Sequence, residues 1–155
     1  LPLLKLPALP IDGLDVWPPI AGKPGAQNPH EGYGIWYGMH RKPLTPTQKI
    51  VLVEGELDAI KVSQALANRP AVWAAMGSSL SEEQIKFIQA QKNPIVLFFD
   101  NDEAGVDARN KMLKRLSKVK SGVFVIENYF NLNDPDEIVD KGFLPQALKS
   151  MRRVD

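Results

Sequence analysis

The sequence predicts an α/β domain in which a parallel four-stranded sheet is flanked by helices, preceded by a proline-rich N-terminal arm. Three observations predict this fold. Short runs of aliphatic and β-branched residues recur from residue 50 onward, as expected for strands covered on both faces. Segments with apolar residues at helical spacing lie between these runs. Capping and turn residues separate the two kinds of segment. Such alternation is typical of a parallel sheet with right-handed crossovers.

The predicted elements follow one another in a regular order. The first strand is the continuous run at residues 50–53, and Leu57 and Ile60 are predicted to lie on the inner face of the helix that follows it. Trp73 lies in the second strand and is predicted to be part of the core. The strands are predicted at 50–53, 71–75, 95–99 and 122–126, and the helices at 56–67, 82–91, 104–118 and, more briefly, from 134 onward and at 145–152.

Two of the predicted helices carry clear start signals. Ser81 and Gln84 form a capping box, in which the hydroxyl and the amide side chain each bond the other residue's backbone N–H. Asp134, Pro135 and Glu137 mark a second start, with the aspartate as cap, the proline at the first helical position and the glutamate completing a second capping box. These signals support the predicted boundaries independently of the apolar pattern.

The composition suits one globular domain. The chain has 155 residues, 44% of them hydrophobic, and a formal net charge of +1. Because this net charge is close to zero, metal ions, local basic patches or neighbouring domains would have to balance the charge of any bound phosphate. The lack of cysteine excludes disulfides, zinc ribbons and thiolate nucleophiles in this chain, and it fits a reducing cytoplasm. No apolar run approaches the ~20 residues of a membrane helix.

Residues 1–46 differ from the rest of the chain. They hold nine of the 13 prolines, and proline fixes φ and removes a backbone donor. We expect an extended arm here, with one short ordered piece at 33–39 that suits an edge strand, and a folded catalytic domain at 47–155. The chain begins with Leu, which suggests a piece of a longer protein.

Carboxylates follow two of the predicted strands at the edge where ligands bind. Glu54 comes directly after the first strand, and Asp100 and Asp102 come directly after the third. In open parallel sheets the ligand site lies beyond the carboxyl ends of the strands. Converging carboxylates repel one another unless a cation lies between them, and all-oxygen ligation suits Mg²⁺. The glycines at 55, 77 and 105 would leave room for a phosphate beside the backbone.

Each carboxylate also has a purely structural interpretation. Asp102 is placed to cap the helix that begins near residue 104, and Glu54 alone would be a solvated strand end. Taken singly, each residue favours that interpretation. The combination on one sheet edge shifts the balance toward a metal site. For Asp58, one turn into the first helix, a helix-dipole or salt-bridge role is favoured.

The order of these motifs resembles the Toprim family. The segments VLVEGELDAI at 51–60, MGSSLS at 76–81 and LFFDNDEAG at 97–105 are similar to its successive motifs, and the resemblance covers about residues 49–140. Within the family, these motifs are most similar to those of bacterial and phage DNA primases and primase-helicases. The segments YGMH at 37–40 and DPDE at 134–137 also resemble the primase sequences. The zinc-binding domain, the basic N-terminal half of the primase core and a Walker A motif are missing, so the arm would be a remnant of the preceding primase subdomain.

The resemblance implies a function and roles for named residues. It implies Mg²⁺-dependent nucleotidyl transfer, with Mn²⁺ as a substitute, making RNA primers on a DNA template in replication. Glu54 would act as general acid/base and contact metal, while Asp100 and Asp102 would be metal ligands. Asp134 and Asp136 would belong to an outer acidic set, with helix capping as an equally good interpretation. The implied partners are template DNA, ribonucleotides and a replicative helicase in cis or in trans, with no membrane, in the nucleoid-associated cytoplasm.

Substrate contacts are harder to assign. Gly55, Gly77 and Ser78 are candidates because they lie in the strand-end loops, and His40 and Arg41 form a small basic patch before the first strand. Solvated surface charge is the favoured interpretation of the last two. Two alternatives to a primase stay open: a small Toprim nuclease that uses the same carboxylates to hydrolyse phosphodiesters, and a non-catalytic interaction module.

Overall fold

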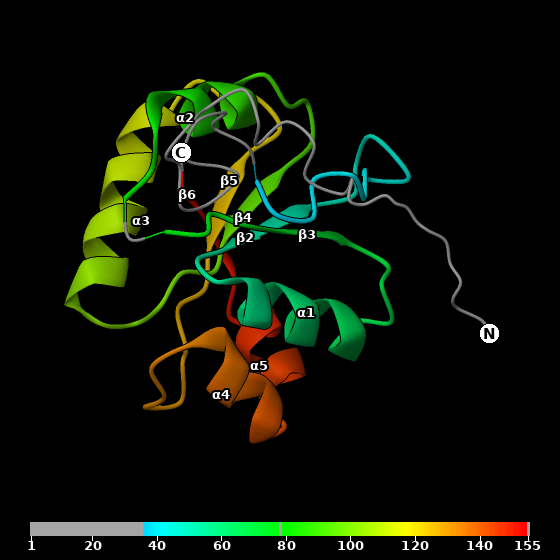
Figure 1. Ribbon diagram of the computed structural model, residues 1–155, viewed down its shortest axis with the longest axis vertical. Coiled ribbons are helices and arrows are strands. Elements are labelled where there is room, and N and C mark those ends of the chain that lie inside the picture. Colours follow the sequence, from blue (N-terminus) through cyan, green and yellow to red (C-terminus); the bar gives the residue numbers. More distant parts are fainter. Residues whose placement is uncertain (1–35, 78, 155) are drawn as a thin grey trace, which may run out of the picture. The chain divides into compact units, whose positions relative to one another are not determined.

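The computed structural model describes residues 36–77 and 79–154, which form a sheet between two layers of helices (Figure 1). The sheet has five strands in the order β3-β2-β4-β5-β6. Neighbouring strands β2, β3, β4 and β5 are parallel, and β6 runs antiparallel to β5 at one edge. The strands are β2 (Ile50–Val53), β3 (Ala71–Ala74), β4 (Ile95–Leu97), β5 (Val123–Val125) and β6 (Arg152–Val154).

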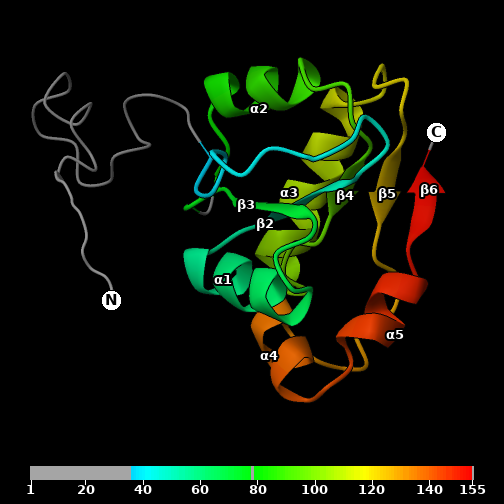
Figure 2. The same cartoon turned by 90° about the vertical axis from the view of Figure 1, so that its right-hand side faces the viewer.

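Alternate residues of each strand supply the two faces of the core. Ile50 and Leu52 face helices α2 and α3, whereas Val51 and Val53 face α1, α4 and α5. All four are buried, which explains why the run is apolar without alternation. Figures 1 and 2 show α2 and α3 on one side of the sheet and the other three helices together. The helices are α1 (Glu56–Ala65), α2 (Glu82–Gln89), α3 (Glu103–Arg115), α4 (Pro135–Asp140) and α5 (Leu144–Lys149).

The predicted α/β class and the four parallel strands are confirmed, but the end of the chain differs. A helix predicted at 145–152 ends at Lys149, and residues 152–154 add the antiparallel edge strand β6. This strand is only three residues long, and two of them are exposed arginines. It therefore carries no apolar alternation from which a strand could be predicted.

The predicted inner face of α1 was wrong. Leu57 and Ile60 are 53% and 39% exposed, while the buried residues of α1 are Asp58, Ala59, Val62 and Ser63. The helix turns its small and polar residues inward because it packs closely on β3 and on α4. The buried position of Asp58 matters for the site described below.

Both predicted caps are confirmed, but only the first capping box is complete. Ser81 Oγ accepts a hydrogen bond from Gln84 N at 3.1 Å, and Gln84 Oε1 accepts from Ser81 N at 3.0 Å, so the box is complete. Asp134 caps α4, accepting from Glu137 N at 2.8 Å. Glu137, however, accepts from Asn133 N rather than from the cap residue, so this second box is not complete.

The arm falls mostly outside the described residues, including Tyr33 to Ile35 of the predicted edge strand. Within the described part, that strand is reduced to a single antiparallel bridge between Tyr37 and Ala74. Trp36 is buried and donates its indole N–H to Gln84 O at 3.1 Å, so this ring packs into the core. Trp73 is fully buried in the core, as predicted. In the described residues, every helix is too short or too polar to cross a membrane.

Candidate metal centre

Glu54 and Asp100 meet at the point where the chain reverses its direction across the sheet. From β2 the chain passes to β3 on one side and then returns to β4 on the other side. This is a topological switch point, at which ligands bind in open α/β sheets. The Glu54 carboxylate accepts a hydrogen bond from Asp100 N at 2.9 Å. The two side chains that follow β2 and β4 are therefore neighbours, as the sequence predicted.

The start of α3 lies directly against this pair. Asp102 Oδ1 accepts a hydrogen bond from Gly105 N at 2.8 Å, so Asp102 is the helix cap. A Cβ at Gly105 would lie 2.0 Å from the Asp100 carbonyl oxygen and 2.8 Å from Glu54 Oε2. The space beside Gly105 is thus filled by the protein's own backbone and carboxylate. The prediction that Gly105 makes room for a phosphate was wrong; the glycine lets α3 approach the acidic loop.

A loop after β5 brings a second group of carboxylates to the same edge. Tyr129 OH donates to Phe99 O at 2.5 Å, and Asn101 N donates to Asn133 O at 2.6 Å. These two bonds tie residues 129–133 to the segment around Asp100. Asp134 therefore follows immediately beside the acidic loop, although 33 positions separate Asp134 from Asn101.

Asp58, Asp134 and Asp136 form the tightest acidic group among the described residues. One carboxylate oxygen of each lies within 4.8 Å of the others. Asp58 Oδ1 accepts from Asp136 N at 3.0 Å, and Lys61 Nζ lies 2.6 Å from Asp136 Oδ1 and 2.8 Å from Asp140 Oδ1. These contacts hold the start of α4 against α1. This group could hold a metal ion.

The two groups of carboxylates interact electrostatically. Burial, followed by the negative charges of Glu54, Asp58, Asp134 and Asp102, raises the pKa of Asp100 to about 7. Burial and the charges of Asp134 and Asp136 raise the pKa of Asp58 to about 6, against two backbone hydrogen bonds that lower it. Burial also raises the pKa of Glu54. The carboxylates therefore form one surface that disfavours its own negative charge.

A divalent cation fits this surface. Asp100 Oδ1 is buried and has no hydrogen-bond partner among the described residues. An acceptor left unsatisfied in this way is unfavourable, and a cation would satisfy it and reduce the mutual repulsion. The donors available are carboxylate oxygens, which suit the hard cations Mg²⁺, Mn²⁺ and Ca²⁺ rather than softer metals.

The sequence prediction and the structure differ in how the carboxylates are grouped. Among the described residues, carboxylate oxygens of Glu54, Asp100 and Asp102 do not all lie within 4.8 Å of one another. Asp134 and Asp136 instead form such a group with Asp58. Sequence reasoning missed Asp58. The available signal was its place in the first turn of α1, which begins two residues after Glu54.

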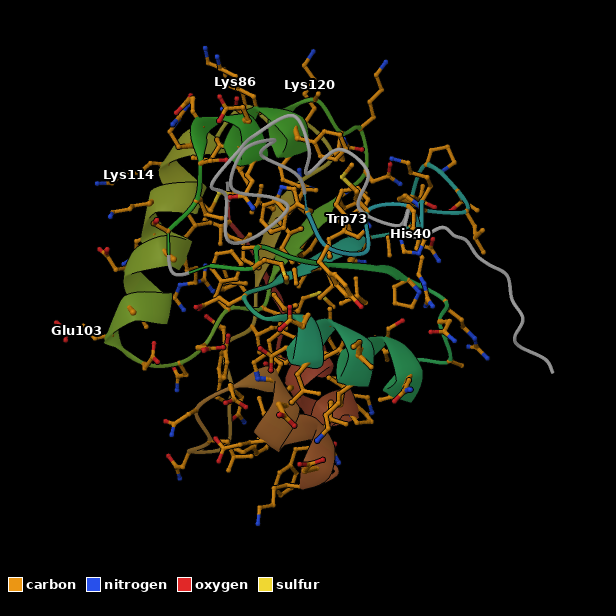
Figure 3. All side chains as sticks on the ribbon, viewed as in Figure 1. His40, Trp73, Lys86, Glu103, Lys114 and Lys120 are labelled. Atoms are coloured by element: carbon orange, nitrogen blue, oxygen red, sulfur yellow. The ribbon has the colours of Figure 1, made fainter. Side chains whose placement is uncertain are left out.

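The predicted substrate residues lie in different places. Arg41 Nη1 donates to Ser63 Oγ at 3.1 Å and Asn68 Oδ1 at 2.7 Å, at the end of α1 remote from the carboxylates. Figure 3 shows His40 on the opposite side of the view from Glu103, which begins α3. The structure thus does not bring these two residues to the acidic edge.

The strand-end residues proposed for substrate contact lie closer to the site. Gly55 precedes α1, and a Cβ there would lie 3.4 Å from Asp58 Oδ2, an ordinary contact distance. Gly77 is exposed just beyond β3, after Met76, whose φ of 65° is unusual for a residue with a side chain. Ser78 lies outside the described residues. The roles of Gly55 and Gly77 stay predictions.

The metal-free chain is expected to lose stability as the pH rises from 5 to 8. Asp58 and Asp100 bind protons more tightly in the folded chain, with pKa values of about 6 and about 7, than an unperturbed aspartate does. A raised pKa contributes stability that is lost as the pH rises through the folded value. Urea unfolding in EDTA at several pH values measures this. A stability that stays constant or increases over this range would contradict it.

Comparison with known proteins identifies a family. The Toprim-like family model matches residues 51–139. A DNA primase of Staphylococcus aureus is 41% identical over 102 residues, which are 65% of this chain and 16% of that protein. A DNA primase of Staphylococcus epidermidis is 34% identical over 113 residues, 73% of this chain and 18% of its own length. The chain thus spans less than a fifth of these relatives.

A solved structure has the same fold. A DNA primase domain from Pseudomonas aeruginosa superimposes with a TM-score of 0.60 at 24% identity, over 76% of this chain and 39% of that one. At this identity the likeness concerns the fold alone.

Proposed function

Since this chain belongs to the Toprim-like family, we propose that it is the catalytic domain of a DNA primase, which joins ribonucleotides into primers on a DNA template. The observation that carries the proposal is the acidic edge, where the negative charges of Glu54 and Asp134 both act on Asp100. A carboxylate with a purely structural role would not need other carboxylates beside it. The relatives, which are named DNA primases, favour this function over a nuclease.

Magnesium is the cation we propose for the site. Mg²⁺ takes one or two carboxylates, keeps several waters and completes its shell with substrate phosphates. Asp100 would be the central ligand because its Oδ1 is buried without a partner among the described residues. Asp102 would contribute its second oxygen, since Oδ1 caps α3. Asp58, Asp134 and Asp136 would hold a further cation. The cations would supply positive charge where the phosphate becomes more negative.

The side chains of the site would orient and activate the reacting groups. The 3′-hydroxyl oxygen of the primer forms a bond to the α-phosphorus of a nucleotide, the bond to pyrophosphate breaks, and the hydroxyl proton must leave. Glu54 is our candidate for accepting this proton, because burial raises the pKa of its carboxyl group and makes it a stronger base. Its hydrogen bond from Asp100 N keeps it at the site.

Lys61 has a positioning role in this proposal. It contacts Asp136 and Asp140 of α4 from α1 and so ties the two helices that carry Asp58 and Asp134. It does not contact the reacting groups in the proposed reaction. The contact of α4 with α1 keeps the outer carboxylates beside the inner ones.

The domain would work with nucleic acid and with other protein parts. Its proposed substrates are a DNA template and ribonucleotides, and its proposed partner is a replicative helicase, in cis or in trans. A primase catalytic domain that resembles it in fold has been solved bound to single-stranded DNA. The near-neutral charge of this chain means that template binding would depend on local basic groups and on other domains.

A chimaera tests the proposed function. Residues 51–139 of this chain replace the corresponding segment of the Staphylococcus aureus DNA primase, and the product is incubated with Mg²⁺, single-stranded DNA and ribonucleotides. We expect new oligoribonucleotides, because the grafted segment carries the acidic edge. A folded chimaera that makes no primers would contradict the proposal, and one that instead shortens the DNA would indicate a nuclease.

A further inference from the structure

A polar cavity lies beside the acidic loop. It has a volume of about 330 Å³, is open to solvent on one side and is lined by α3, the end of β5 and the edge strand β6. Asn101, which lies between Asp100 and Asp102, forms part of its wall. The cavity and the acidic edge thus share one loop. Its other polar lining residues are Arg109, Asn110, Glu127, Tyr129 and Arg152.

The cavity contains one uncompensated positive charge. Arg152 forms an ion pair with Glu127, so these two lining residues neutralise each other. Arg109 forms neither an ion pair nor a hydrogen bond within the described part of the chain, and its Nε is buried. A buried donor on a charged group is unfavourable unless an acceptor reaches it. The side chain therefore lacks the anionic or polar partner that such groups normally have.

Neighbouring groups favour an acceptor with several oxygens. The guanidinium of Arg109 lies close enough to Tyr129 to oppose the increase in the pKa of that phenol caused by burial. Asn101 and Asn110 add side-chain amides to the wall. A planar guanidinium beside amide donors matches the geometry of a phosphate group better than that of a single carbonyl.

We propose that this cavity, through Arg109, binds a phosphate group of the nucleotide or nucleic-acid substrate. A free anion would be repelled by the carboxylates across the loop, whereas a phosphate that belongs to a larger substrate can be held by Arg109 while its neighbours reach the acidic edge. The identity of the substrate rests on the proposed function; the anion site itself rests on the unpaired arginine. Arg109 is thus a binding residue on α3 that the sequence motifs did not single out.

The Nε–H signal of Arg109 in ¹H–¹⁵N NMR spectra tests this site in the full 155-residue chain. Inorganic phosphate, ATP and a twelve-residue oligothymidylate are each titrated in EDTA at fixed ionic strength. We expect a saturable shift with ATP or with the oligonucleotide, and these two arms distinguish a nucleotide from a strand as the source of the phosphate. No shift with either, or a shift with inorganic phosphate alone, would overturn the proposal.

Two substitutions on α3, each of which removes one positive charge, distinguish a specific phosphate site from a general electrostatic attraction to the helix. Arg109→Gln should weaken binding at least tenfold, whereas Lys114→Gln should change it less than twofold, because Lys114 points away from the domain (Figure 3). Equal losses in both variants would overturn the proposal. If Arg109→Gln lowers the unfolding temperature, the Arg109→Lys variant is tested in its place. This variant keeps the positive charge but lacks the Nε donor, so it should still bind measurably more weakly.

The anion site and the metal centre fail independently in these experiments. Phosphate binding is measured without divalent ions, so Asp100→Asn should leave it intact or strengthen it. Conversely, Arg109→Gln should leave Mn²⁺ binding at the acidic edge unchanged. A chain that binds Mn²⁺ but shows no Arg109 shift would contradict this inference alone, and the reverse result would contradict the metal centre alone.

Discussion

Replacing Asp100 by asparagine should lower primer synthesis by the chimaera at least about a hundredfold, the size typical for a lost charge-stabilising group in an active site. The same change should stabilise the metal-free chain at pH 8 by roughly 1 kcal/mol or more, because it removes a carboxylate whose ionisation is disfavoured by burial and by four acidic neighbours. Primer yield and urea unfolding in EDTA measure the two effects. Loss of activity combined with gain of stability is not expected of a residue that only supports the fold.

Asp107→Asn is the matched control for this substitution. Asp107 lies on α3, is 66% exposed and pairs with Lys111 one turn away. Such a surface pair contributes little, so activity and stability should both change only slightly. If Asp100→Asn retains full Mg²⁺-dependent activity, or if both variants lose activity equally, Asp100 is not the central ligand.

Replacing Gly105 by alanine should destabilise the fold by about 2–4 kcal/mol and disturb the metal centre as well. The added Cβ would lie 2.0 Å from the Asp100 carbonyl oxygen and 2.6 Å from its carbonyl carbon. These are backbone atoms at the end of the sheet, so the helix must move away from the acidic loop. Such a movement would separate Asp102, which caps α3, from Asp100 and Glu54. Thermal unfolding and Mn²⁺ titration measure the two consequences.

Gly55→Ala is the control for the loss of a glycine near the site. An added Cβ at Gly55 would meet Asp58 Oδ2 at 3.4 Å, an ordinary contact, and its backbone φ of −109° is open to any residue. We expect its free energy of unfolding to change by less than about 1 kcal/mol. A Gly105→Ala variant as stable as this control would show that α3 can shift without disturbing the acidic loop.

Sequence reasoning was most successful where interactions between residues close in the sequence determine the structure. The buried strands β2, β3 and β4 are continuous apolar runs because both faces of the sheet are covered. The cap at Ser81 depends on residues three positions apart, so it can be read locally. The meeting of Glu54 with Asp100 followed from topology, since parallel neighbours end at one edge.

Sequence reasoning failed where contacts between residues far apart in the sequence determine the structure. Asp58 is buried because α4 docks on α1, and the contact between residues 58 and 136 leaves no local pattern in the sequence. The loop that brings Asp134 beside Asp100 depends on bonds from Tyr129 and Asn101 to remote backbone atoms. For the same reason no sequence motif singled out Arg109. Only the edge strand β6 and the end of β5 make it part of a cavity wall.

The central claim is that carboxylates from three separate segments bind divalent cations together at one sheet edge, and Mn²⁺ relaxation of amide NMR signals in the full chain tests it most directly. At substoichiometric Mn²⁺, signals from residues 54–58, 100–105 and 134–137 should broaden together and before the rest, and Asp100→Asn should prevent this. Broadening that begins instead at exposed acids such as Asp107 and Glu127, or that reaches only one of the three segments, would contradict the account.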